Sequence, residues 1–229
     1  MIHRVFFILQ LVMKVYFISG LAADSRVFHH IRLADEHEMV HLHWIEPVAN
    51  ETLGSYAERL AEKIDTTEPF GLVGLSMGGM IAAEISQRYK PVSTILISSI
   101  PCSLHLPTWF KWAGKLNLHK VVPASFFKAS SLAKRSFTQE SKEDKILLKQ
   151  IIRESDNKFI QWGLGAIITW DMTQAPASYI HIHGTSDELL PAKYTHPTHY
   201  IKKGGHLMIM NRADEVNSII NNELSRLVS

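Results

Sequence analysis

The chain has 229 residues, 46% hydrophobic and 20% charged, with a formal net charge of +2. This predicts one globular domain over residues 1–229 and excludes the basic excess typical of a nucleic-acid-binding protein. Cys102 is the only cysteine, so an internal disulfide is excluded, a reducing compartment is favoured, and we expect a cytoplasmic protein.

The N-terminal segment, residues 1–13, is mostly apolar behind Arg4, as in a signal peptide. It lacks a small-residue cleavage site, and Lys14 leads directly into the first predicted strand, so we expect no export. The run is too short to span a bilayer, and we expect no stable membrane insertion. The segment is either an extra strand at the sheet edge or an upstream extension, in which case translation of the working protein starts at Met13. We favour the second interpretation.

Strand-like and helix-like segments alternate along the chain. Apolar residues recur at helical spacing from Leu53 to Ile64, for example, which predicts an amphipathic helix. The alternation predicts an α/β fold with a mostly parallel, doubly wound sheet and helices on both faces. We expect strands near 15–18 and 39–45, a strand that begins at 70, and strands at 93–99, 178–184 and 198–201. We expect helices after Asp24, from Thr52, after Ser76 and over 213–228.

The segment 70–80 carries the most informative motif, in which a short apolar strand runs straight into a helix. Gly74, Ser76 and Gly78 form a G-x-S-x-G elbow with the serine at the corner. A sharp turn of this kind leaves no room for side chains two residues before or after the serine, and Gly79 lets the helix lie close to the sheet. The Ser76 hydroxyl is then expected near a helix N-terminus, which favours developing negative charge.

Between Pro101 and about Asp171 the alternation stops, and a helical insertion is expected. Its helices are predicted near 107–117, 123–135, 141–154 and 157–169, and Ser141 with Asp144 is similar to a capping box at the start of the third. Most of its aromatic residues must pack onto the core, but one or two facing a pocket would form an apolar site for an acyl or alkyl group. The aromatic residues are Trp109, Phe110, Trp112, Phe126, Phe127, Phe159, Trp162 and Trp170.

Two further polar residues follow predicted strands near the C-terminus. Asp187 lies on a loop just past the strand 178–184, and His206 lies on the glycine-rich loop after the strand 198–201. Open α/β sheets bind their ligands at the carboxyl ends of strands, so Ser76, Asp187 and His206 are candidates for one site. Glu188 or Asp171 could replace Asp187 as the acid.

From Val15 to Val228 the chain resembles the α/β-hydrolase family. The resemblance rests on the elbow, on the H-G-x-x-D segment at 183–187 and on Gly-Gly-His at 204–206. It implies a single hydrolase domain with a core of 13–101 and 172–229, and a helical lid insertion of about 102–171.

The resemblance also implies residue roles. Ser76 would be the nucleophile, His206 its base, and Asp187 the acid that orients the imidazole. The backbone N–H groups of Met77 and Leu21 would form the oxyanion hole. Many family members have His-Gly where this chain has Ser19-Gly20.

These expectations together indicate a serine hydrolase that cleaves a small, largely apolar ester or thioester through an acyl-enzyme, with no cofactor. The same scaffold can instead carry a non-catalytic or weakly catalytic ligand-binding or signalling protein, and this alternative stays open.

The histidines outside this set suggest no metal site. His181 and His183 fall on one face of a strand, but no third ligand follows at sensible spacing, so packing or hydrogen bonding is favoured. His30 and Asp35 form an H-x4-D string similar to that of some acyltransferases, which we attribute to coincidence.

Overall fold

The computed structural model describes residues 12–115, 123–134 and 141–226. A six-stranded sheet crosses it in the order β2-β1-β3-β4-β5-β6, and every neighbouring pair is parallel. The strands are β1 (Met13–Ile18), β2 (His37–Leu42), β3 (Phe70–Leu75), β4 (Ser93–Ile97), β5 (Ile180–Gly184) and β6 (His199–Ile201). The predicted parallel α/β fold is confirmed. Because β1 lies between β2 and β3, the strand order reverses there, and the carboxyl ends of β1 and β3 flank the position where such sheets bind ligands.

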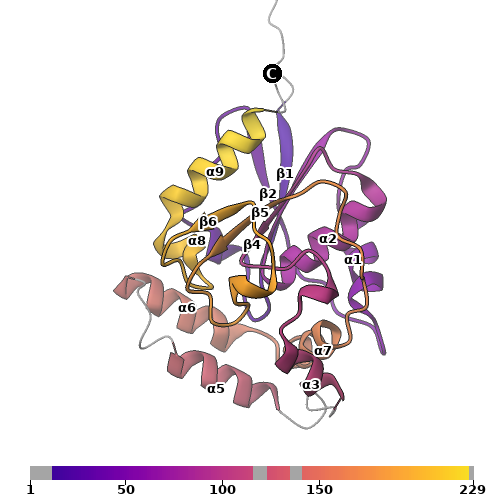
Figure 1. Ribbon diagram of the computed structural model, residues 1–229, viewed down its shortest axis with the longest axis vertical. Helices are drawn as coiled ribbons and strands as arrows, with labels where there is room; N and C mark the ends of the chain where they lie inside the picture. Colours follow the sequence, from indigo (N-terminus) through magenta and orange to yellow (C-terminus); the bar gives the residue numbers. More distant parts are fainter. Residues whose placement is uncertain (1–11, 116–122, 135–140, 227–229) are drawn as a thin grey trace, which may run out of the picture.

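Helices cover both faces of the sheet (Figure 1). On β1, Tyr16 and Ile18 pack into the core beneath α1 (Leu53–Ala61) and α2 (Met77–Tyr89). Val15 and Phe17 point to the opposite face, where α8 (Met208–Asn211) and α9 (Ala213–Ser225) complete a second core. This period-two alternation lets one short strand contribute to both hydrophobic layers.

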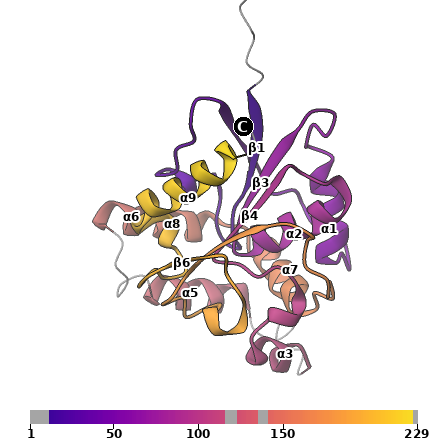
Figure 2. The same cartoon turned by 45° about the horizontal axis from the view of Figure 1, so that its top comes forward.

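Within the described residues, four α-helices occupy the predicted insertion between β4 and β5. They gather at the carboxyl ends of the strands, below the sheet in Figure 1, and Figure 2 gives the same grouping. They are α3 (Thr108–Lys115), α5 (Ala124–Lys134), α6 (Lys142–Glu154) and α7 (Asn157–Ile168). The parts of the predicted helices that fall in 116–122 and 135–140 lie outside the described residues, as does the segment 1–11.

Some local predictions were wrong in extent. The helix expected after Asp24 is only a short 3-10 turn, η1 (Ser25–Phe28), which the Asp24 carboxylate caps. It stays short because the chain has to re-enter the sheet, where β2 begins at His37. The capping box of α6 is only half formed. Ser141 Oγ accepts the Asp144 N–H at 3.0 Å, while the Asp144 carboxylate turns toward His29 and His30. Among the helices of the described residues, none is long and apolar enough to cross a membrane.

Candidate active site

Ser76 stands at the corner between β3 and α2 with a backbone that L-residues rarely adopt, φ 53° and ψ −120°. Such a conformation costs about 1–3 kcal/mol and persists only where its surroundings hold it. Here the Ser76 N–H donates to the Ile97 carbonyl at 2.9 Å, and Ser99 Oγ donates to the Ser76 carbonyl at 2.7 Å. The end of β4 therefore holds the strained corner in place.

The two elbow glycines have a steric reason to be glycine. A Cβ atom at Gly74 would overlap the backbone of Gly78, and one at Gly78 would overlap the carbonyl oxygens of Ile18 and Ser19. Because those carbonyls belong to the end of β1, the start of α2 lies directly against the loop that follows β1. The sequence pattern predicted this crowding around Ser76.

The structure brings Ser76, His206 and Asp187 into one hydrogen-bonded series. His206 Nε2 lies 2.9 Å from Ser76 Oγ, and His206 Nδ1 lies 2.8 Å from Asp187 Oδ2. A carboxylate can only accept, so Nδ1 carries the ring proton and the Nε2 lone pair faces the serine hydroxyl. That arrangement is suited to removing the hydroxyl proton. Glu188 and Asp171, the other candidate acids, are exposed.

Asp187 is held by more than His206. Its Oδ1 accepts the N–H groups of Leu189 and Leu190, both at 2.9 Å. Burial by itself would raise the pKa of Asp187, but the nearby His206 charge and hydrogen bonds from His183, His206 and the Leu190 N–H hold the pKa below its usual range. The carboxylate is thus ionised at neutral pH although its side chain is fully buried.

A buried histidine pair lies behind Asp187. His183 Nε2 donates to the Leu190 carbonyl at 2.7 Å and lies 3.4 Å from Asp187 Oδ2. Its Nδ1 therefore accepts, and His181 Nε2 donates to it at 3.0 Å. The sequence predicted packing or hydrogen bonding for these histidines but missed the contact of His183 with the Asp187 loop. The only sequence signals for this contact were that His181 and His183 share one face of β5 and that His183 lies four residues before Asp187.

Leu21 lies on the loop after β1 and Met77 at the start of α2, and both side chains adjoin Gly163 of α7. Met77 is the first residue of α2, and a Cβ at Gly20 would lie 3.3 Å from Ser76 Cβ, so the loop after β1 lies against the serine. Gly163 of α7 touches both side chains, since a Cβ there would lie 2.5 Å from Leu21 Cδ1 and 3.2 Å from Met77 Sδ. Within the described residues, neither backbone N–H donates to another protein group. Neither amide hydrogen is therefore committed to a partner within those residues.

Ser19, the departure from the family's His-Gly, closes this loop. It is 4% exposed, and its hydroxyl donates to the Ala23 carbonyl at 3.1 Å. The Ala23 N–H in turn donates to the Gly20 carbonyl at 3.1 Å. The two bonds fix the loop that carries the Leu21 N–H.

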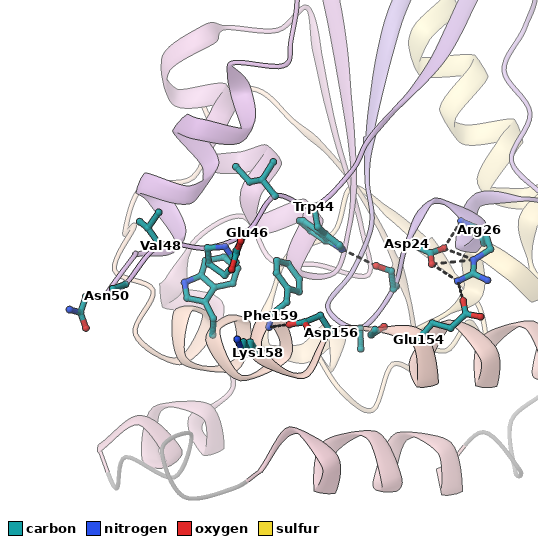
Figure 3. A pocket seen from close by; sticks show the side chains of 17 residues that line it. Asp24, Arg26, Trp44, Glu46, Val48, Asn50, Glu154, Asp156, Lys158 and Phe159 are labelled. Carbon is teal, nitrogen blue, oxygen red and sulfur yellow. Dashed lines mark hydrogen bonds and ion pairs between the residues drawn. The ribbon is translucent and has the colours of Figure 1, made fainter.

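A cavity of about 830 Å³ opens next to this loop (Figure 3). It begins at Ala22, beside Leu21, and aromatic rings of Trp44, Phe159 and Trp162 form one wall. The indole of Trp44 donates to the Ala23 carbonyl at 2.8 Å, so this wall is tied to the loop after β1. The full lining is Ala22, Ala23, Asp24, Arg26, Trp44, Ile45, Glu46, Pro47, Val48, Ala49, Asn50, Glu154, Ser155, Asp156, Lys158, Phe159 and Trp162.

Comparison with known proteins gives a consistent assignment. The model of the Alpha/beta hydrolase family matches residues 15–219. No curated protein sequence matches the chain. A thermophilic esterase from Thermogutta terrifontis, with malate bound, is 18% identical over 95% of this chain and 91% of its own, with a TM-score of 0.73.

Two further solved structures are similar. A hydrolase from Pseudomonas aeruginosa PA01 is 12% identical over 93% of this chain and 89% of its own, with a TM-score of 0.71. MenH from S. aureus is 16% identical over 95% of both chains, with a TM-score of 0.68. At these identities the likeness shows the fold.

Replacing Gly78 with alanine should destabilise the protein, because the added methyl group would overlap the Ile18 and Ser19 carbonyls, which are backbone and can move only with β1. We expect the free energy of unfolding, measured by urea denaturation, to fall by about 1–3 kcal/mol. Gly205→Ala is the matched control, since a Cβ there meets nothing within 4 Å. Equal stability of Gly78→Ala and wild type would contradict the close packing.

His181 should make stability depend on pH. Burial, with the neighbouring His183, lowers its pKa from 6.5 to about 3. As pH falls below 6.5, the unfolded chain therefore takes up a proton that the folded chain does not, and the free energy of unfolding decreases by up to ~1.4 kcal/mol per pH unit. In urea denaturation between about pH 6 and pH 4, His181→Gln should show a shallower decline than wild type. Parallel curves would mean that His181 is not held neutral.

Proposed function

Because this chain belongs to the alpha/beta hydrolase family, we propose that it is a serine hydrolase that cleaves a small, largely apolar carboxylic ester or thioester through an acyl-enzyme. The observation that carries the proposal is the hydrogen-bonded series of Ser76, His206 and Asp187 at the strained elbow. In an ordinary tight turn, we would not expect a histidine within hydrogen-bonding distance of the serine and a buried carboxylate on the other side of that histidine.

In the first half-reaction, Ser76 Oγ attacks the substrate carbonyl while His206 Nε2 takes the hydroxyl proton. The imidazolium that forms is stabilised by Asp187, and the Leu21 and Met77 N–H groups donate to the oxyanion. As the tetrahedral intermediate collapses, the bond to the leaving group breaks and His206 returns the proton to the leaving oxygen or sulfur. A water molecule then attacks the acyl-enzyme while His206 takes its proton. The bond between the carbonyl carbon and Ser76 Oγ breaks, His206 returns the proton to Ser76 Oγ, and the carboxylic acid is released.

The aromatic wall of the cavity beside the loop after β1 supports an apolar substrate group, while charged residues line the rest of the cavity. Phe159 and Trp162 from α7 form its wall, so the inserted helices act as a lid that contributes part of the substrate site. A group bound there lies next to Leu21, which donates to the oxyanion in this mechanism. The similar structure from Thermogutta terrifontis is that of an esterase, which agrees with ester chemistry on this fold.

Removing the nucleophile should abolish turnover of a test ester such as p-nitrophenyl butyrate. We expect Ser76→Ala to lower kcat at least roughly 10⁴-fold, and His206→Ala to lower it by a similar factor, because the two side chains act as one unit. Circular dichroism should show that both variants keep the wild-type fold.

Ser86→Ala is the matched control for this experiment. Ser86 lies on the same helix as the elbow, and its hydroxyl only donates to the Ala83 carbonyl at 2.8 Å, so its loss should leave kcat within a factor of about two. A Ser76→Ala variant that retains wild-type turnover would refute the serine hydrolase mechanism. Ligand-dependent stabilisation of wild type without any turnover would instead favour the binding-protein alternative.

Filling the cavity should change which acyl chains are accepted. Val48 lines the cavity and is 55% exposed, so Val48→Trp can fill space there without disturbing the core. We expect kcat/KM for a hexanoate ester to fall about 10-fold or more while that for an acetate ester changes little, since only the longer chain needs the occupied volume.

Val92→Trp controls for adding an indole to the surface. Val92 is 44% exposed and precedes β4, away from the lining of the cavity, so both esters should be hydrolysed as by wild type. If Val48→Trp lowered kcat/KM equally for both esters, the cavity would not bind the acyl chain.

A further inference from the structure

Three side chains outside the candidate active site converge on one point. His29 and His30 follow the turn η1, and Asp144 lies in the first turn of α6. His29 Nε2 and His30 Nε2 lie 3.0 and 3.1 Å from the same oxygen, Asp144 Oδ1. One ligand atom from each of the three residues lies within 4.8 Å of the other two. The two histidines are 33% and 42% exposed, while the Asp144 side chain is 6% exposed, so solvent reaches the cluster from the histidine side.

The hydrogen bonding of His29 is in conflict when the ring is neutral. Its Nδ1 lies 3.0 Å from the Arg26 carbonyl and its Nε2 lies 3.0 Å from Asp144 Oδ1, and both neighbours can only accept. A neutral imidazole has a single N–H. If that proton is on Nδ1 and is donated to the Arg26 carbonyl, the Nε2 lone pair of His29 faces a lone pair of the Asp144 carboxylate. A cation bound between them would remove the repulsion.

The arrangement of His29 is also the one that metal-binding histidines adopt. Such histidines donate the second ring N–H to a backbone carbonyl or a carboxylate, which fixes the tautomer and directs the other nitrogen at the ion. The Arg26 carbonyl provides that acceptor.

Asp144 is directed at the histidines and at no other charged group. In a complete capping box its carboxylate would accept the Ser141 N–H, but only the Ser141 half of the box is formed. Within the described residues, no lysine or arginine forms an ion pair with Asp144. A nearly buried carboxylate with two imidazoles as its partners is a ligand set for a cation.

We propose that His29, His30 and Asp144 bind a divalent transition-metal ion of the zinc type. Two imidazole nitrogens and one carboxylate oxygen suit such an ion, and water completes its coordination from the exposed side. This site is distinct from the hydrolase chemistry proposed above and does not depend on it.

The ion would attach the lid helix α6 to the core. The other end of α6 is already attached, because Arg26 Nη2 lies 2.6 Å from Glu154 Oε2 and also pairs with Asp24. Asp24 directly follows the loop that carries Leu21. Metal binding would therefore fix both ends of α6 against the segment that leaves the candidate oxyanion hole, and its main effect would be on stability.

The test uses tag-free protein freed of metal with a chelator and then desalted. Zn²⁺ should raise the Tm by roughly 5–10 °C at about a 100-fold excess over its Kd. Co²⁺ should bind at one ion per chain and show the visible d–d absorption of a low-coordinate nitrogen and oxygen site. Both effects should be lost in His30→Ala and in Asp144→Asn.

His199→Ala is the matched control, since His199 also pairs with a carboxylate, Glu223 at 3.7 Å, but within the described part of the chain that pair has no third ligand. It should keep the wild-type response to both ions. Absence of a Zn²⁺-dependent Tm shift in wild type, or an equal shift in His30→Ala, would overturn the proposal.

Discussion

The close approach of Gly78 to the carbonyl oxygens of Ile18 and Ser19 determines how the elbow and the loop after β1 lie relative to each other. It sets the start of α2 against the end of β1, so the loop carrying Leu21 has to pass beside Ser76. The strain at Ser76 is tolerated because β4 binds its backbone through Ile97 and Ser99. Ser76, Leu21 and Met77 therefore lie at the point where the strand order reverses, and rigid strands position all three.

The loops after β5 and β6 position the other half of the site, Asp187 and His206. The two loops are joined by the Ser186 N–H, which donates to the Gly204 carbonyl at 2.9 Å, and this bond sets Asp187 beside the loop of His206. Behind them, His183 donates to the Leu190 carbonyl and so steadies the chain whose amides bind Asp187. Ionisation of the buried Asp187 carboxylate is thus supported by His206 on the neighbouring loop and by His183 and the Leu190 N–H close to it in the chain.

The sequence predicted the parts of this arrangement that are local. The elbow, the strand ends carrying Asp187 and His206, and the helical insertion all follow from patterns within a few residues. Long-range contacts that follow from neither a motif nor a strand end were beyond it: nothing near His30 in the sequence indicates Asp144, 114 positions away. The helix expected after Asp24 failed for a similar reason. The pattern there is compatible with a helix, but the chain must return to the sheet at His37, and only a single 3-10 turn forms.

Labelling with a fluorophosphonate probe, followed by peptide mapping, tests the central claim most directly, because the probe reports an activated serine without needing the natural substrate. The account predicts a covalent adduct on the peptide that contains Ser76. The adduct should be absent from Ser76→Ala and strongly reduced in His206→Ala. Folded wild-type protein that stays unlabelled, or that carries the adduct on another serine, would contradict it.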